Sequence, residues 1–118
     1  MTGRPNTSTV LGTAQVADVL AMVRAARMTD GVEPLSEHVL LHLRYDSPAD
    51  PGPGRDFILT ADGEIAGYAY LDPLPADPES DVSGELVIHP DRRRQGLGRT
   101  LAGELAAAAG GHPLRLWA

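Results

Sequence analysis

Glu85-Leu-Val-Ile-His-Pro-Asp-Arg-Arg-Arg-Gln-Gly-Leu-Gly-Arg99 is the stretch that says most about how this 118-residue chain folds. Its first part, as far as Ile88, is a short apolar run of the kind that forms a buried strand. A basic loop follows, and an alanine-rich helix is predicted over Leu97–Ala109, with a glycine cap behind it. A further strand is predicted from Leu114 to Ala118. The stretch therefore predicts a strand-helix-strand unit near the end of the chain.

The start of that helix is suited to holding an anion. The first N–H groups of a helix are unpaired and lie at the positive end of its dipole, so a pyrophosphate can bind there. Gly96 and Gly98 leave room for close approach and allow backbone conformations that other residues avoid. Gly-x-Gly alone also fits an ordinary helix start with solvated arginines. Neither a Walker loop nor Gly-x-Gly-x-x-Gly is present, which argues against a nucleoside triphosphate loop and a dinucleotide fold.

The rest of the chain predicts helices first and strands afterwards. Apolar residues recur at helical spacing over Ala14–Met28, and Ser36 is suited to start a second helix that extends to Arg44. Two strand-like runs with a short glycine-containing connection, Asp56–Thr60 and Glu64–Leu71, predict an antiparallel hairpin. Residues 1–13 are expected to be weakly ordered, apart from a short strand at Val10 and Leu11.

These elements predict an α+β, or mixed α/β, fold in which helices flank a central, mostly antiparallel sheet. Because the chain stops inside its last predicted strand, that strand would be left without its neighbour. We therefore expect residues 1–118 to be a single domain that is truncated at its C-terminal end.

Composition narrows the classes of partner. The formal net charge is −6, which argues against nucleic acid and anionic membranes. All basic residues are arginines, and several of them lie together in the segment 92–99, which indicates a local anion site. Cysteine is absent, so disulfides, thiolate metal sites and cysteine nucleophiles are excluded, and a reducing cytoplasm fits. No window approaches the roughly 18 apolar residues of a membrane span, so we expect a soluble, cytoplasmic protein.

The glycine-containing helix start resembles the acetyl-CoA signature of the GNAT family of N-acetyltransferases, Arg/Gln-x-x-Gly-x-Gly/Ala after a strand and a proline. Here the motif is Arg93-Arg94-Gln95-Gly96-Leu97-Gly98, and Leu86-Val87-Ile88-His89-Pro90 precedes it. The resemblance implies a GNAT-like acyl-CoA N-acyltransferase fold and acetyl-CoA as the acetyl donor. It implies that the strand backbone pairs with the pantetheine arm and that loop N–H groups hold the pyrophosphate. The residues implied to bind the cofactor are Leu86, Val87, Ile88, Arg93, Arg94, Gln95, Gly96, Leu97, Gly98 and Arg99.

Asp30-Gly31-Val32-Glu33-Pro34-Leu35-Ser36-Glu37, together with the terminal Leu116-Trp117-Ala118, resembles the N-terminal half of the mycothiol synthases. This GNAT group has two tandem domains and acetylates the cysteine amine of a cysteinyl-glucosaminyl-inositol. The resemblance implies that Glu37 contacts the substrate and that the leaving-group acid lies beyond Ala118. It assigns the chemistry to the second domain, so the alternative is a non-catalytic acetyl-CoA-binding companion domain. The implied partners are a small-molecule amine and either a second GNAT domain or a second copy, through the open sheet edge.

Two acidic residues are candidates for the chemistry. Glu85 adjoins the predicted cofactor strand, which makes it a candidate general base or substrate contact. The alternative is a strand-end carboxylate that lies in solvent or pairs with an arginine. From spacing alone, Glu37 is an ordinary acid in the first turn of a helix, where the dipole favours it.

Histidines and tyrosines leave further alternatives. His38 and His42 have the i, i+4 spacing of zinc ligands, but no third ligand accompanies them, so no metal is expected. Tyr68 and Tyr70 alternate on one strand face with Ala66, where they either pack in the core or line the substrate cleft.

Overall fold

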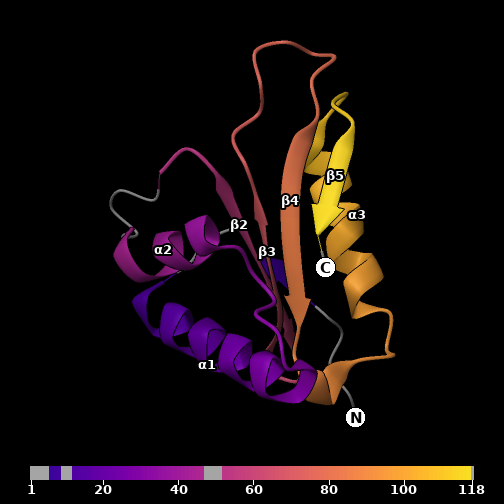
Figure 1. Ribbon diagram of the computed structural model, residues 1–118. Coiled ribbons are helices and arrows are strands. Elements are labelled where there is room, and N and C mark those ends of the chain that lie inside the picture. The colour runs from indigo at the N-terminus through magenta and orange to yellow at the C-terminus, as the bar shows by residue number, and fades with distance from the viewer. Residues whose placement is uncertain (1–5, 9–11, 47–51, 118) are drawn as a thin grey trace.

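A computed structural model describes residues 6–8, 12–46 and 52–117 of the chain. In this described part, the strands form one sheet in the order β1-β2-β3-β4-β5. The strands are β1 (Asn6–Ser8), β2 (Arg55–Ala61), β3 (Glu64–Leu71), β4 (Val82–Ile88) and β5 (Leu114–Trp117). The helices are α1 (Thr13–Asp30), α2 (Glu37–Tyr45), α3 (Leu97–Ala109) and the short 3-10 helix η1 (Pro90–Arg92). Successive strands from β1 to β4 are antiparallel and β5 is parallel to β4, which confirms the predicted α+β fold (Figure 1).

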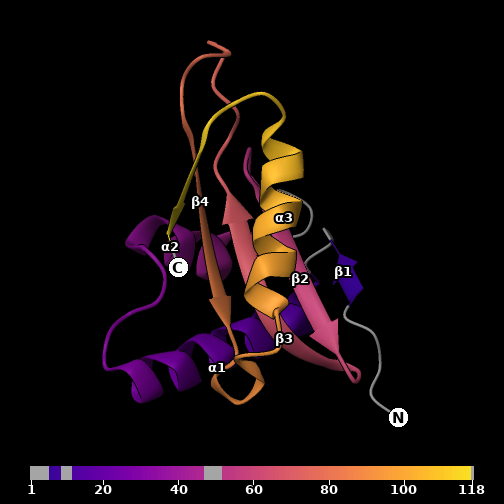
Figure 2. The same cartoon turned by 90° about the vertical axis from the view of Figure 1, so that its right-hand side faces the viewer.

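The sheet separates two helical layers. Helices α1 and α2 cover one face and α3 covers the other (Figure 2). Because side chains alternate along a strand, β2 supplies both cores: Phe57 and Leu59 pack on the α3 side, and Ile58 packs on the α1–α2 side. Helix α3 contributes its buried leucines to the first core, namely Leu97, Leu101 and Leu105. The core is thus built by two opposite faces of the same sheet, as layered α+β domains require.

Both N-terminal helices lie where the periodicity predicts them, within two residues at each end. Helix α1 ends at Gly31, which takes the left-handed conformation (φ 76°) and donates its N–H to the carbonyl of Arg27. Ser36 occupies the predicted N-cap position of α2, but its hydroxyl forms no cap bond to that helix. That hydroxyl is engaged elsewhere, in the functional site described below.

The β2–β3 connection is a tight hairpin. Asp62 and Gly63 both have positive φ, at 56° and 79°, which is the backbone that a two-residue hairpin turn needs. A register shift follows within the hairpin, between Leu59 and Thr60, where the strand pairing is irregular. An irregularity of this kind turns neighbouring side chains to the opposite face.

This irregularity corrects one detail of the sequence prediction. Ala66 was expected to share a strand face with Tyr68 and Tyr70, but it packs in the α3-side core. Both tyrosines pack in the α1–α2-side core instead.

The ends of the chain differ in part from expectation. Asn6–Ser8 form a short edge strand, although the sequence indicated a weakly ordered start. The strand predicted at Val10 and Leu11 lies outside the described residues, and so does Ala118. Across the described residues, none of the helices combines the length and hydropathy that a membrane crossing would need.

Candidate functional site

One side of β4 is unpaired beyond its midpoint. In a strand, the backbone N–H and C=O groups of alternate residues face opposite neighbours. In β4, the backbone groups of odd-numbered residues point toward β3, and those of even-numbered residues point toward β5. Three backbone hydrogen bonds show this: His89 N to Ala66 O, Asp72 N to Ser83 O, and Val82 N to Pro113 O. Pairing with β5 reaches only as far as Glu85, opposite Trp117. The register directs the N–H of Leu86 at the carbonyl of Trp117, so the carbonyl of Leu86 and both backbone groups of Ile88 face a side on which no described strand pairs with them.

A cleft of about 510 Å³ lies beside this free edge. One wall is the segment that joins α1 to α2, and the other is formed by the end of β4 and the loop that leads into α3. The lining residues are Asp30, Val32, Glu33, Pro34, Leu86, Val87, Ile88, Arg92, Arg93, Arg94, Gly96, Leu97 and Gly98. The cofactor residues predicted from sequence line this cleft, except for Gln95 and Arg99, both of which are exposed.

The N-terminus of α3 opens into the cleft. Gly96 is its N-cap and has a φ of 78°, a conformation that residues with a Cβ rarely adopt. The first helical bond runs from the N–H of Thr100 to the carbonyl of Gly96, so the N–H groups of the three residues between them have no acceptor within the helix. A Cβ on Gly98 would meet only Ile88 Cγ1, at an ordinary 3.8 Å. Internal packing therefore does not require glycine at position 98.

Two of the clustered arginines are held by carboxylates. Arg92 donates to Asp62 Oδ2 at 2.8 Å and lies 3.4 Å from Glu64 Oε2, which ties the loop to the β2–β3 hairpin. Arg93 donates from both terminal nitrogens to the two oxygens of Asp30, each at 2.7 Å. This hydrogen bond lowers the pKa of Asp30, so the pair stays ionised at neutral pH.

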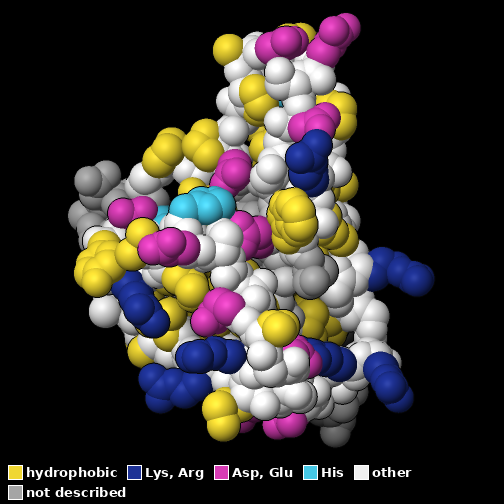
Figure 3. All heavy atoms as spheres, in the orientation of Figure 1, with side chains coloured by type: hydrophobic (Ala, Val, Ile, Leu, Met, Phe, Trp, Pro, Cys, Tyr) yellow, Lys and Arg dark blue, Asp and Glu magenta, His cyan; other side chains and the backbone are white. Residues whose placement is uncertain are grey.

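The other two arginines of the cluster are available for a ligand. Arg94 and Arg99 are exposed, and within the described part of the chain neither has a carboxylate partner. Arginine side chains are spread across the lower part of the molecule, along α1 and beside the start of α3 (Figure 3). Positive charge therefore remains beside the open helix terminus.

A second pocket, of about 430 Å³, adjoins the cleft along β4. It shares Glu33 and Pro34 with the cleft. Its other lining residues come from the start of α2, from β4 and its preceding loop, and from β5: Leu35, Ser36, His38, Asp72, Ser83, Glu85 and Trp117. The pocket therefore lies next to the point where the free edge of β4 begins.

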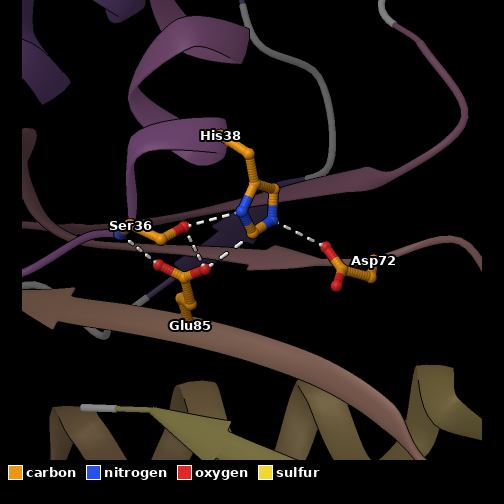
Figure 4. A network of polar contacts seen from close by, with 4 residues as sticks. All are labelled: Ser36, His38, Asp72 and Glu85. Atoms are coloured by element: carbon orange, nitrogen blue, oxygen red, sulfur yellow. Dashed lines mark hydrogen bonds and ion pairs between the residues drawn. The ribbon is translucent and has the colours of Figure 1, made fainter.

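Glu85 is the buried acid of this second pocket, with 6% of its surface exposed. Its two oxygens accept from the backbone N–H and the hydroxyl of Ser36, both at 2.6 Å (Figure 4). His38 bridges outward, with Nδ1 2.9 Å from Ser36 Oγ and Nε2 3.1 Å from Asp72 Oδ1. Glu85 is thus neither solvated nor paired with an arginine, and it attaches the start of α2 to β4.

Glu37 lies apart from this network. It is exposed in the first turn of α2 and is not among the residues that line the pocket around Ser36 and Glu85. Its assignment as a substrate contact stays a prediction.

Beneath α2 lies a buried polar network that the sequence did not indicate. His42, 8% exposed, is 2.7 Å from Asp56 Oδ1 through Nε2 and 2.6 Å from Asp46 Oδ2 through Nδ1. Tyr68 donates its hydroxyl to the same oxygen of Asp56, and Tyr70 packs on the His42 ring with centroids 4.8 Å apart. Burial alone would lower the pKa of His42, but the bonds to the two carboxylates raise it above its ordinary value.

This network decides between the two alternatives left for the tyrosines. Tyr68 is fully buried, burial raises the pKa of its hydroxyl, and both tyrosines pack in the core under α2. Among the described residues, no three or more histidine, aspartate or glutamate side chains are grouped so that they would hold a metal ion.

The residues that sequence reasoning missed are those whose partners are distant in the chain. Ser36 and Glu85 are 49 positions apart, and Asp30 and Arg93 are 63 apart. Ser36 is an ordinary helix N-cap residue and Asp30 ends a helix, whereas Glu85 lies within β4 and Arg93 in a loop, and no local pattern marks their long-range contacts. Of these four residues, Glu85 had been singled out by its proximity to the cofactor strand, and Arg93 as part of the acetyl-CoA motif.

Comparison with known proteins finds a family model and curated relatives that match this chain. The model of the acetyltransferase (GNAT) family matches residues 20–118. A mycothiol acetyltransferase of Thermomonospora curvata is 49% identical over 104 residues, which are 88% of this chain and 32% of that protein. One from Geodermatophilus obscurus is 46% identical over 109 residues, 92% of this chain and 34% of its own length. The chain thus spans about a third of the curated relatives it matches.

Solved structures share the fold at low sequence identity. A tandem GNAT protein from the clavulanic acid biosynthesis pathway has a TM-score of 0.70 at 23% identity, over 96% of this chain and 36% of that one. A predicted acetyltransferase from Clostridium acetobutylicum, solved with acetyl-CoA, has a TM-score of 0.64 at 14% identity, over 100% of this chain and 81% of its own. With the family match over most of its length and the same arrangement of sheet and helices, the chain belongs to the GNAT family of acetyltransferases.

Proposed function

We propose that this chain binds acetyl-CoA in the cleft beside β4 and takes part in transfer of the acetyl group to a primary amine. The observation that carries the proposal is the free edge of β4, which leads directly to the glycine-opened N-terminus of α3. A free strand edge offers backbone donors and acceptors to an extended amide-containing chain, and a helix N-terminus offers N–H groups to a diphosphate. The two lie end to end in one cleft, which fits the pantetheine arm and pyrophosphate of CoA.

The residues that would hold the cofactor follow from this arrangement. The backbone of Leu86 and Ile88 would pair with the amides of the pantetheine arm, with the Val87 backbone between them. The unpaired N–H groups at Leu97, Gly98 and Arg99 would hold the pyrophosphate. Because a Cβ in a helix is tilted toward the helix N-terminus, one on Gly98 would project toward the proposed phosphate position, which is a reason for glycine that internal packing does not supply.

The charges around the cleft complete the proposed cofactor site. Arg94 and Arg99 lie near the helix terminus without a carboxylate partner in the described part of the chain, so their guanidinium groups are free to contact phosphates. Gln95 is exposed in the same loop, where its backbone contributes to the turn.

The reaction needs little more than placement and charge stabilisation. When bound, acetyl-CoA supplies the thioester that a neutral amine attacks. An N–H group on the free edge of β4 would then stabilise the negative charge that develops on the carbonyl oxygen, an effect of about 3 kcal/mol for a preorganised donor. Glu85 is the candidate general base or amine contact, since a carboxylate oxygen that accepts one hydrogen bond retains a lone pair for another.

The acceptor is proposed from the relatives. The relatives are named mycothiol acetyltransferases. Together with the resemblance to the mycothiol synthases, this favours the cysteine amine of a cysteinyl-glucosaminyl-inositol as acceptor, with Glu37 as a further substrate contact. We place the reaction in the cytoplasm and take residues 1–118 as part of one acetyltransferase domain. A second GNAT domain, or a second copy, would join it along the exposed edge of β5.

A non-catalytic companion domain is the second candidate, and one observation favours it. Both oxygens of Glu85 are engaged by Ser36, so the acid nearest the free edge has a structural task already. A companion domain would bind acetyl-CoA through the same cleft and leave the acetyl transfer to another domain.

Amine-dependent release of CoA separates the two candidates. The chain is mixed with acetyl-CoA and a cysteinyl amine, and the released thiol is trapped with a chromogenic disulfide after correction for the acceptor's own thiol. Transfer by the wild type that is lost in Glu85→Gln and kept in Glu79→Gln supports a catalytic domain, because Glu79 is exposed on the β3–β4 loop and undergoes the same chemical change. Acetyl-CoA binding without transfer supports the companion domain, and absence of both refutes the proposal.

A further inference from the structure

The segment 30–36, between α1 and α2, is fixed at both ends to the opposite wall of the cleft. At one end, Asp30 accepts two hydrogen bonds from Arg93 in the loop before α3. At the other end, Ser36 donates two to Glu85 on β4. Glu33, between the two attachments, lines both the cleft and the second pocket. The separation of the two walls is therefore set by these paired contacts.

The Asp30–Arg93 contact engages both terminal nitrogens of Arg93 and fixes the direction of its guanidinium. Both of these nitrogens, Nη1 and Nη2, point at the two oxygens of Asp30 at 2.7 Å. This bidentate contact is among the strong ones that an arginine side chain makes, and a guanidinium that turned the same two N–H donors to a phosphate would have to give it up. The contact also raises the pKa of Arg93, consistent with a stable ion pair.

Apart from the contact with Arg93, nothing in the described part of the chain favours a carboxylate at position 30. Asp30 is the last residue of α1, and a carboxylate at a helix C-terminus is disfavoured by the helix dipole. Arg93 offsets this cost, and Arg92 holds the other side of the same loop through Asp62. The loop that carries Gly96 is thus held between two carboxylates from different elements.

We propose that Asp30 is a positioning residue of the cofactor site, and that Arg93 acts as a strut between α1 and the phosphate-binding loop and does not itself bind a phosphate. The inference rests on the proposed function, because it concerns the acetyl-CoA cleft. It leaves Arg94 and Arg99 as the side chains that meet the phosphates.

Calorimetric titration with acetyl-CoA distinguishes a strut from a phosphate ligand, because the two roles of Arg93 predict opposite changes in affinity for Asp30→Asn. If Arg93 is a strut, Asp30→Asn weakens binding by about threefold to fivefold, the scale of a well-formed surface ion pair. Arg93→Gln weakens it equally, and the double variant is no weaker than either single variant. Asp30→Glu keeps a carboxylate within reach and restores the affinity, which general destabilisation by the substitution would not explain.

Glu33→Gln is the matched control, because it also removes one negative charge from the cleft lining and has no contact with Arg93. It is expected to tighten acetyl-CoA binding slightly through the electrostatic field alone. The strut is refuted if Asp30→Asn tightens binding as much as Glu33→Gln does. It is also refuted if Arg93→Gln alone costs about tenfold and flattens the salt dependence, as loss of a direct phosphate contact would.

Hydrogen exchange without ligand separates failure of the strut from failure of the proposed function. Loss of the strut should speed amide exchange across residues 92–96 in both Asp30→Asn and Arg93→Gln. Unchanged exchange in that loop refutes the strut, whatever the ligand does. A folded wild-type chain that binds no acetyl-CoA refutes the proposed function, and faster loop exchange in the variants would still support the strut.

Discussion

Replacing Ser36 with alanine should loosen α2 from β4 by an amount that the structure allows us to estimate. The substitution removes the hydroxyl that donates to Glu85 Oε2 at 2.6 Å and leaves that oxygen in a site where the residue is only 6% exposed. Loss of one partner of a buried charged acceptor costs about 2 kcal/mol. The usual loss of an N-cap, about 1 kcal/mol, is not added, because the hydroxyl makes no cap bond in α2.

Urea unfolding followed by circular dichroism measures this cost. With a denaturant slope of about 2 kcal/mol per molar, the midpoint of the Ser36→Ala variant should fall by about 1 M. Ser36→Thr keeps the hydroxyl and should stay close to the wild type. In a Glu85→Ala background, Ser36→Ala should cost little, because its acceptor has gone. An equal loss in both backgrounds, or a change below about 0.5 kcal/mol in the wild type, would refute this account of the α2–β4 attachment.

Two further predictions concern the core under α2. Gly54→Ala would place a Cβ 1.9 Å from the hydroxyl oxygen of buried Tyr70, so it should lower the free energy of unfolding by about 1–3 kcal/mol. In the control, Gly111→Ala, the added Cβ meets open space and should cause no such loss. Equal urea midpoints for the two variants would contradict this packing. Since the pKa of His42 is raised in the fold, its contribution to stability is complete below the unfolded value of about 6.5 and is lost as pH rises through the folded value. Urea midpoints should therefore fall with rising pH more steeply in the wild type than in His42→Gln, and parallel profiles would contradict the assignment.

Sequence predicted the elements well because their signals are local. The helical periodicity over 14–28, the turn chemistry of Asp62-Gly63 and the glycine that opens α3 each depend on residues within a few positions. The loop of arginines lines the cleft, and its signal is local in the same way, since a strand, a proline and a Gly-x-Gly follow one another directly.

What the sequence did not predict depends on tertiary pairing. Nothing local indicates that Arg93 meets Asp30 or that Ser36 bonds to Glu85 in place of capping its own helix. Ala66 packs on the unexpected face because β3 carries an extra residue there: Leu59 pairs with Gly67 and Thr60 with Ile65, and strict alternation along the strand does not reveal such an irregularity.

The central claim is that the cleft between β4 and α3 holds acetyl-CoA with its pyrophosphate on the helix terminus. Calorimetric titration of acetyl-CoA into the wild type, Gly98→Glu and Gly103→Glu tests it most directly. Both variants add the same side chain and charge to α3, but position 98 faces the cleft, whereas position 103 is exposed one to two turns further along the helix and meets open space. Saturable binding that is lost in Gly98→Glu and kept in Gly103→Glu is the predicted result. Binding that survives Gly98→Glu unchanged would contradict the placement of the cofactor.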